Sequence, residues 1–254
     1  MAHEFPFQAA YSDQRMNFAG TVDDAFDGAR IIAKTGGIDQ SSYWEPSHLV
    51  HAAMDHVPTY DPARPQLISQ AAEVTTSFYD GSATSEAVTD LWEDFTARAL
   101  GNVMLSHRTD NDTYEATNPA FSKQNADQLR TLLGEHPALF IAIGHGGIVP
   151  ATQTFLHYRE AQPDSTLYPV RFSTRKQKDP YPRLSHDEVT HLQEQAERRA
   201  VVVYDDDAAS GRTLKEAVPF FRNMLAGKLV LGMANDDTRR PLVKEAQGTY
   251  WERV

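Results

Sequence analysis

Cysteine is absent from this 254-residue chain. Its absence excludes disulfide bonds, thiolate nucleophiles and zinc sites built from cysteine. Long apolar runs are also missing, and none approaches the roughly 20 residues that a membrane-spanning helix needs. The first residues lack the basic start and apolar core of a secretory signal. We therefore expect a cytoplasmic protein without a membrane contact.

Positive charge is scarce as well. The chain has 24 Lys and Arg residues against 35 Asp and Glu residues, which gives a formal net charge of −11. Nucleic acids and anionic membranes are bound mainly through Lys and Arg, so neither is expected as a partner. The hydrophobic content of 41% and the length are sufficient for one large domain or two small ones.

The first half of the chain has helical patterns and no strand signal of comparable strength. Apolar spacing, capping residues and terminal Gly or Pro predict helices over 22–34, 46–57, 65–79, 85–107 and 120–134. We expect residues 1–134 to form a helical addition. Two roles stay open for it: shaping the pocket of a small-molecule acceptor, or forming an interface between two copies in a homodimer.

From residue 138 the pattern changes to short apolar runs that alternate with helices. Strands are predicted over 138–144, 166–173, 200–205 and 228–234, and helices over 148–160, 186–199 and 213–225. Ser185 and Glu188 have the spacing of a capping box at the start of one helix. The alternation is typical of an α/β domain with a doubly wound parallel sheet, here over 135–254.

Polar residues that could bind a ligand are concentrated in one segment of this domain, residues 200–214 (AVVVYDDDAASGRTL). It reads as a buried strand that ends in acid and turns through a tight loop into a helix. Carboxylates at a strand end can hold Mg²⁺ or sugar hydroxyls, and free N–H groups at a helix start can hold an anion. Such a junction suits a ligand that carries sugar hydroxyls, Mg²⁺ and phosphate.

The segment resembles the signature of type I phosphoribosyltransferases, in which an apolar strand, two acids and three residues precede Thr/Ser-Gly-x-Thr. Asp205 and Asp206 match the acid pair, and residues 210–213 match the loop. The resemblance implies a sheet of phosphoribosyltransferase type. It also implies that the acid pair contacts the ribose hydroxyls of phosphoribosyl diphosphate, directly or through Mg²⁺. The 5-phosphate would be wrapped by Ala209, Ser210, Gly211, Arg212 and Thr213.

Two positions depart from the family pattern. Asp207 stands where an aliphatic residue is usual. It is one candidate for the general base, and a group from the helical half is the other. Ala209 stands where 6-oxopurine enzymes of the family carry an acid that helps the purine nucleophile. The departure at Ala209 argues against ordinary hypoxanthine or guanine salvage and leaves the acceptor open.

A second motif follows the strand predicted over 138–144. Gly144, His145, Gly146 and Gly147 resemble the diphosphate-binding loop of the same family, with His145 in place of the usual Arg or Lys. A bound diphosphate would favour the protonated form of that histidine. The alternative interpretation is an ordinary glycine-rich turn between a strand and a helix, which is frequent in α/β folds.

A third motif is the basic segment, residues 171–183, which carries the main concentration of positive charge in the chain. A solvated loop is one interpretation. The other is a mobile loop that closes over the reaction centre, brings cations to the diphosphate and excludes water. The residues expected to bind the donor are Arg171, Ser173, Arg175, Lys176 and Lys178.

Glu45, His48 and His51 are spaced for one helix face. That spacing is compatible with a metal site. Histidine pairs on a helix are usually surface or core residues, however, and no further ligand is obvious, so we favour a packing role.

These observations lead to one hypothesis: Mg²⁺-dependent transfer of a 5-phosphoribosyl group from phosphoribosyl diphosphate to an unidentified acceptor, with release of diphosphate. A non-catalytic sensor or regulator that binds the same donor is an alternative. A hydrolase or kinase acting on another phosphate is a third possibility, although the sequence contains no Gly-x-x-x-x-Gly-Lys-Ser/Thr motif.

Overall fold

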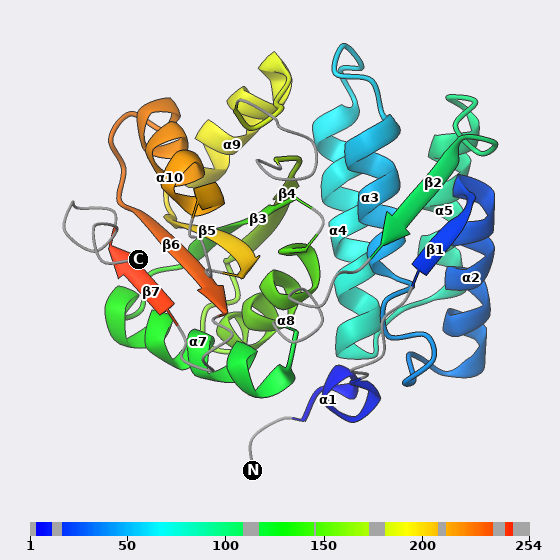
Figure 1. Cartoon of the computed structure of the whole chain (residues 1–254), viewed down its shortest axis with the longest axis horizontal. Coiled ribbons are helices and arrows are strands. Elements are labelled where there is room, and N and C mark those ends of the chain that lie inside the picture. The colour runs from blue at the N-terminus through cyan, green and yellow to red at the C-terminus, as the bar shows by residue number, and fades with distance from the viewer. Residues whose placement is uncertain are drawn as a thin grey trace. The chain divides into compact units, whose positions relative to one another are not determined.

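The computed structural model describes residues 4–11, 17–108, 117–144, 146–172, 181–207, 212–235 and 242–245. The chain divides into two compact units, Met1–Tyr114 and Glu115–Val254, and each is described by itself (Figure 1). The boundary that the sequence pattern suggests near residue 135 falls after α7 (Pro119–Leu133). This helix packs against α8 (Ile148–Arg159) and belongs to the second unit.

The first unit is built mainly from helices. They are α1 (Pro6–Ala10), α2 (Val22–Thr35), α3 (Ser47–His56), α4 (Arg64–Asp80) and α5 (Ser85–Thr96). The predicted helices over 22–34, 46–57 and 65–79 are therefore confirmed. Thr21 caps α2 as its sequence indicates, because its side chain accepts a hydrogen bond from the Asp24 N–H at 3.1 Å.

The helix predicted over 85–107 is wrong in its second half. The helix α5 ends at Thr96, and the chain then forms β2 (Met104–Arg108), which pairs antiparallel with β1 (Asn17–Thr21). The expectation of no strand in this half is therefore also wrong. The reason is tertiary: the carbonyls of Gly101 and Val103 accept the N–H groups of Asp23 and Val22, both at 2.9 Å. The exposed N–H groups of a helix start need such acceptors.

The second unit contains a five-stranded sheet in the order β4-β3-β5-β6-β7. Its strands are β3 (Ala138–Ile143), β4 (Thr166–Val170), β5 (Ala200–Asp207), β6 (Val230–Asn235) and β7 (Leu242–Glu245). The first four are parallel, as the apolar runs predict. The edge strand β7 pairs antiparallel with β6 and was not predicted.

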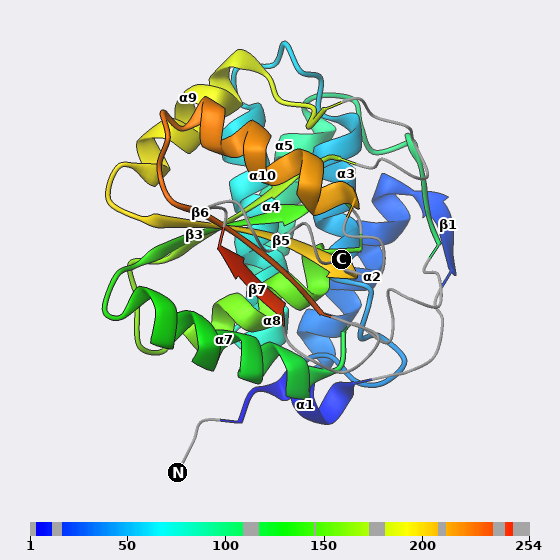
Figure 2. The ribbon, with the colours of Figure 1, turned by 60° about the vertical axis from the view of Figure 1, so that its left-hand side comes forward.

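Helices flank both faces of this sheet (Figure 2). The pair α7 and α8 covers one face, and α9 (His186–Ala196) and α10 (Arg212–Met224) cover the other. The Ser185–Glu188 capping box is present at the start of α9. The arrangement is α/β with a four-stranded parallel core, which is compatible with the expected doubly wound fold.

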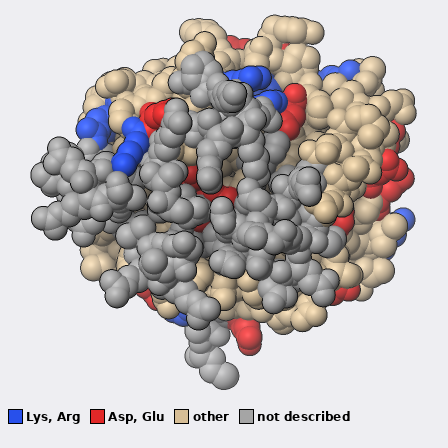
Figure 3. Space-filling view, in the orientation of Figure 1, with Lys and Arg blue, Asp and Glu red and all other residues tan. Residues whose placement is uncertain are grey.

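Charge is divided unevenly between the two units. The first unit holds 6 of the 24 basic residues and 17 of the 35 acidic residues, whereas the second holds 18 of each. The whole net charge of −11 therefore resides in the first unit. Figure 3 shows acidic side chains along the margin formed by α2 and α5. Exposed acids of these helices are Asp24, Asp27, Glu86, Asp90 and Glu93.

No helix within the described ranges combines the length and the apolar character that crossing a bilayer requires.

Candidate functional site

The sheet of the second unit has a topological switch point between β3 and β5. From β3 the chain passes through α8 to β4 on one side, and β5 lies on the other side of β3. Helices after these strands consequently lie on opposite faces of the sheet. In open α/β sheets, ligands bind outside the carboxyl ends of the strands at such a point. The glycine-rich turn follows β3, and the acid pair lies in the last residues of β5, the strand beside it.

The glycine-rich turn packs directly against the end of β5. A β-carbon at Gly147 would lie 2.8 Å from the Tyr204 carbonyl oxygen and 3.2 Å from Asp205 Cα. One at Gly146 would lie 2.5 Å from Asp206 Cγ and would overlap the carboxylate oxygen Oδ2. Only glycine permits this approach. The structure thus brings together two motifs that are about 60 residues apart in the sequence.

The two acids of the pair have different surroundings. Asp205 is buried, with 8% of its surface exposed, and its Oδ1 accepts the Asp206 N–H at 3.0 Å. Asp206 is half-buried, and its carboxylate lies against Gly146. The register of β5 against β6 shifts between Asp205 and Asp207, an irregularity of the kind that re-aims side chains beside active sites.

The basic segment begins beside the same turn. The Gly144 N–H donates to the Val170 carbonyl at 2.8 Å, and a β-carbon at Gly144 would lie 2.5 Å from the Phe172 carbonyl oxygen. Arg171 therefore lies at the carboxyl end of β4, next to the glycine-rich turn. An isolated antiparallel bridge joins Arg171 to Arg183, whose N–H donates to the Arg171 carbonyl at 3.0 Å. The two ends of the basic segment are held together.

Several predicted site residues lie outside the described part of the chain. Thr213, the last residue of the predicted phosphate loop, is described and occupies the first turn of α10. Asp207 ends β5 and Arg212 begins α10, but their side chains are not among those described. The remainder, which the structure does not describe, are His145, Ser173, Arg175, Lys176, Lys178, Ala209, Ser210 and Gly211.

The strand end carries oxygen atoms of the kind that magnesium prefers. Asp205 and Asp206 supply carboxylate oxygens, the ligands that Mg²⁺ prefers. Among the described residues there is no group of three or more His, Asp or Glu side chains that could hold a metal. Two carboxylates are nevertheless sufficient for Mg²⁺ when a substrate phosphate and water complete the coordination.

Glu45, His48 and His51 lie in the first unit. The Nδ1 atom of His48 is 3.3 Å from Glu45 Oε2, and the centroids of the two histidine rings are 6.0 Å apart. Both histidines are 1% exposed, and the ring of Phe18 lies 4.3 Å from that of His48. The cluster is part of the interior of this unit.

Sequence reasoning missed a buried hydrogen-bond cluster beneath the acid pair. Tyr204 precedes Asp205 on β5, and its Oη accepts hydrogen bonds from Asn125 Nδ2 at 2.7 Å and Thr154 Oγ1 at 3.0 Å. All three residues are fully buried. No local signal singles out Asn125 and Thr154, because the buried positions of α7 and α8 also include Ser122, Thr152 and Gln153.

Comparison of the chain with protein-family models, curated proteins and solved structures gives no match.

Proposed function

We propose that this protein transfers the 5-phosphoribosyl group of phosphoribosyl diphosphate to a small-molecule acceptor. The observation that carries the proposal is the contact of Asp206 with Gly146 at the β3–β5 switch point. It unites an acid pair suited to ribose and metal with a turn suited to diphosphate, in the crevice where α/β proteins bind ligands.

Each part of the site has a task in this reaction. Asp205 and Asp206 accept hydrogen bonds from the ribose hydroxyls and stabilise positive charge that develops on the ring as diphosphate leaves. The first turn of α10, with Thr213, lies where the 5-phosphate would be held. Arg171 lies at the base of the segment whose cations would face the leaving group.

The charge arrangement supports a requirement for metal. A diphosphate on the glycine-rich turn would face the Asp206 carboxylate. Two like charges 4 Å apart repel by about 4 kcal/mol at the effective dielectric constant of a protein surface. Bound Mg²⁺ would neutralise this repulsion, and Asp205 and Asp206 are the residues that would hold it. Donor binding is therefore expected to be weak when Mg²⁺ is removed by a chelator.

Calorimetry with phosphoribosyl diphosphate and Mg²⁺ tests the proposal. The wild type should bind the donor, and a screen of acceptors should release diphosphate. Asp206→Asn should lower turnover about 100-fold or more, because a charge aimed at the transition state is removed. The control is Glu194→Gln, which neutralises an exposed carboxylate of α9 and should leave turnover unchanged.

Three other outcomes are informative. Absence of binding heat with the wild type would contradict the proposal. Turnover of Asp206→Asn at the wild-type rate would contradict the assigned role of the acid pair. Binding without diphosphate release for every acceptor tried would favour the sensor alternative.

A further inference from the structure

A cluster of buried hydrogen bonds connects β5 to both helices on one face of the sheet. Asn125 comes from α7, Thr154 from α8 and Tyr204 from β5, and none of them has any exposed surface. The tyrosine hydroxyl is the common partner of the other two side chains. A polar group in such an interior is costly unless it is hydrogen-bonded, so its position is tightly specified.

The same tyrosine touches α8 at two levels. Its hydroxyl bonds to Thr154, in the second half of the helix, and its carbonyl oxygen packs against Gly147, immediately before the helix begins. Asp206 follows Tyr204 by two positions on the same strand. Asp206 in turn lies against Gly146. The hydroxyl and the acid pair are thus two ends of one packed contact between β5 and α8.

Burial raises the pKa of Tyr204 to about 12, although the hydrogen bonds from Thr154 and Asn125 act in the opposite direction. The phenol is therefore neutral at physiological pH.

We propose that the Tyr204 hydroxyl is a positioning group that holds the glycine-rich turn and the start of α8 against Asp205 and Asp206. It does not touch the ligand. Its effect on ligand affinity rests on the proposed function, whereas its effect on the contact between Gly146 and Asp206 does not.

The chain offers a matched control in the same helix pair. Ser122 Oγ on α7 donates to Gln153 Oε1 on α8 at 2.9 Å, and both residues are fully buried. This hydrogen bond joins α7 to α8 rather than to β5. Ser122→Ala and Tyr204→Phe each remove one buried hydroxyl from this interior, but only Tyr204→Phe acts on the strand that carries the acids.

The experiment compares the two variants in the full-length protein. In the absence of ligand, the backbone amide resonances of Gly146, Gly147 and Asp206 should shift in Tyr204→Phe and stay in place in Ser122→Ala. Affinity for phosphoribosyl diphosphate with Mg²⁺ should fall about tenfold or more in Tyr204→Phe alone. Losses of this size are typical when a residue that orients a binding group, without touching the ligand, is replaced. Thr154→Val, which removes one of the two donors, should shift the same resonances by less.

The outcomes separate the two proposals. Equal resonance shifts and equal affinity losses in Tyr204→Phe and Ser122→Ala would overturn the positioning role, because the cluster would then only stabilise the interior. Unchanged site resonances in both Tyr204→Phe and Thr154→Val would overturn it as well. If the wild type does not bind the donor, the proposed function fails, and the resonance shifts alone decide the positioning role.

Discussion

At the scale of single residues, the site depends on what one glycine leaves out. Gly146 has no β-carbon, and the Asp206 carboxylate occupies the space that one would fill. In the sequence, this glycine belongs to a turn that resembles a diphosphate-binding loop. The structure adds a steric reason, because any side chain at this position would displace the acid that is proposed to hold ribose and Mg²⁺.

Gly146→Ala is therefore expected to lower donor affinity more than stability. The new methyl group must push the Asp206 carboxylate away, but this carboxylate is the end of a half-buried side chain that can rotate, so the loss of stability should be small. Thermal unfolding and calorimetry with donor and Mg²⁺ measure the two effects.

Gly28→Ala is the control for that substitution. A β-carbon at Gly28, inside α2, would make only an ordinary contact with Glu45 Oε2 at 3.5 Å. Alanine in a helix interior should raise stability by about 0.5–1 kcal/mol and leave donor affinity unchanged. A Gly146→Ala protein with normal affinity would contradict the steric role of this glycine.

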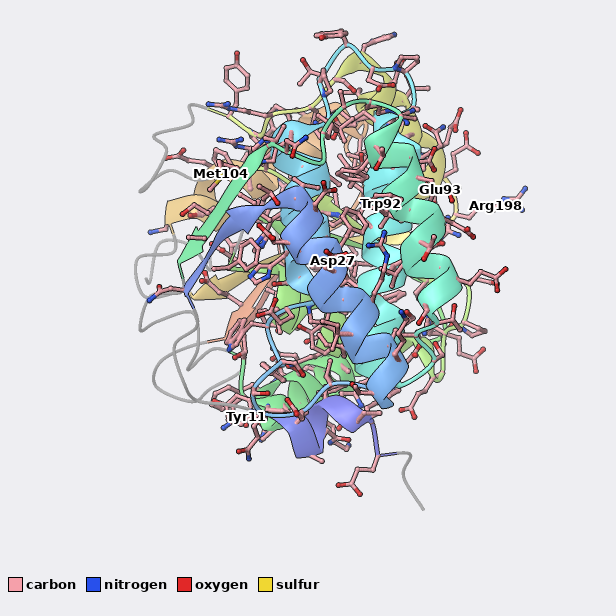
Figure 4. All side chains as sticks on the ribbon, turned by 90° about the vertical axis from the view of Figure 1, so that its right-hand side faces the viewer. Tyr11, Asp27, Trp92, Glu93, Met104 and Arg198 are labelled. Atoms are coloured by element: carbon pink, nitrogen blue, oxygen red, sulfur yellow. The ribbon has the colours of Figure 1, made fainter. Side chains whose placement is uncertain are left out.

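At the scale of elements, the start of α2 organises the first unit. Trp92 Nε1 on α5 donates to Asp23 Oδ1 at 2.8 Å, and the guanidinium of Arg30 lies 4.5 Å from the centroid of the Trp92 ring. Figure 4 shows α2 and α5 side by side, with Asp27 and Trp92 labelled. These contacts join the two helices.

Thr21→Ala is expected to destabilise the protein by about 1 kcal/mol, because it removes the hydroxyl that caps α2. It should also alter the titration of Asp24. Hydrogen bonds from the Thr21 N–H, and then from its hydroxyl, hold the pKa of Asp24 below the ordinary value of 3.8. The variant keeps the N–H, so the pKa should rise only part of the way, which NMR titration of the carboxyl carbon measures.

The sign of the resulting pH dependence follows from this lowered pKa. A carboxyl group whose pKa is depressed by folding contributes its stabilisation fully above the unfolded-state value. That contribution is lost as the pH falls from about 3.8 through the lower pKa of the folded state. Thr21→Ala should therefore show a weaker dependence of stability on pH below about 4. The same loss of stability at acid pH in the wild type and in Thr21→Ala would contradict the capping box.

At the scale of the whole molecule, the two units differ in charge more than in size. The first carries the entire net charge of −11, and the second is balanced. Self-repulsion of like charges opposes compaction and is screened by salt. The first unit should consequently be more sensitive to ionic strength than the second.

Added NaCl is expected to raise the unfolding midpoint of the first unit by a few degrees. Of the three tryptophans, Trp44 and Trp92 lie in this unit, so a Trp251→Phe protein reports on it by tryptophan fluorescence. Amide hydrogen exchange of β3 and β5 follows the second unit in the same protein and should change less. An equal salt response of both units would contradict the electrostatic argument.

Local patterns were sufficient wherever one segment determines its own structure. The continuous apolar runs at 138–143 and 200–203 predicted buried parallel strands because no polar side chain within them has to be accommodated on either face. Thr21 and Ser185 predicted helix starts because capping involves residues only three positions apart. The acid pair and the glycine-rich turn were recognised for the same reason, since each is contiguous in the sequence.

The other features of the fold and of the site depend on residues that are far apart in the sequence. The pattern over 85–107 is helical, yet β2 forms within it because β1 and the start of α2 supply hydrogen-bond partners from about 80 residues away. Likewise, Asn125 and Thr154 are unremarkable in their helices, and only packing places both of them on the Tyr204 hydroxyl. Local sequence patterns were enough to name the candidate residues for the proposed chemistry. The tertiary structure decided that Asp206 meets Gly146, because that contact depends on strand order, which no local pattern encodes.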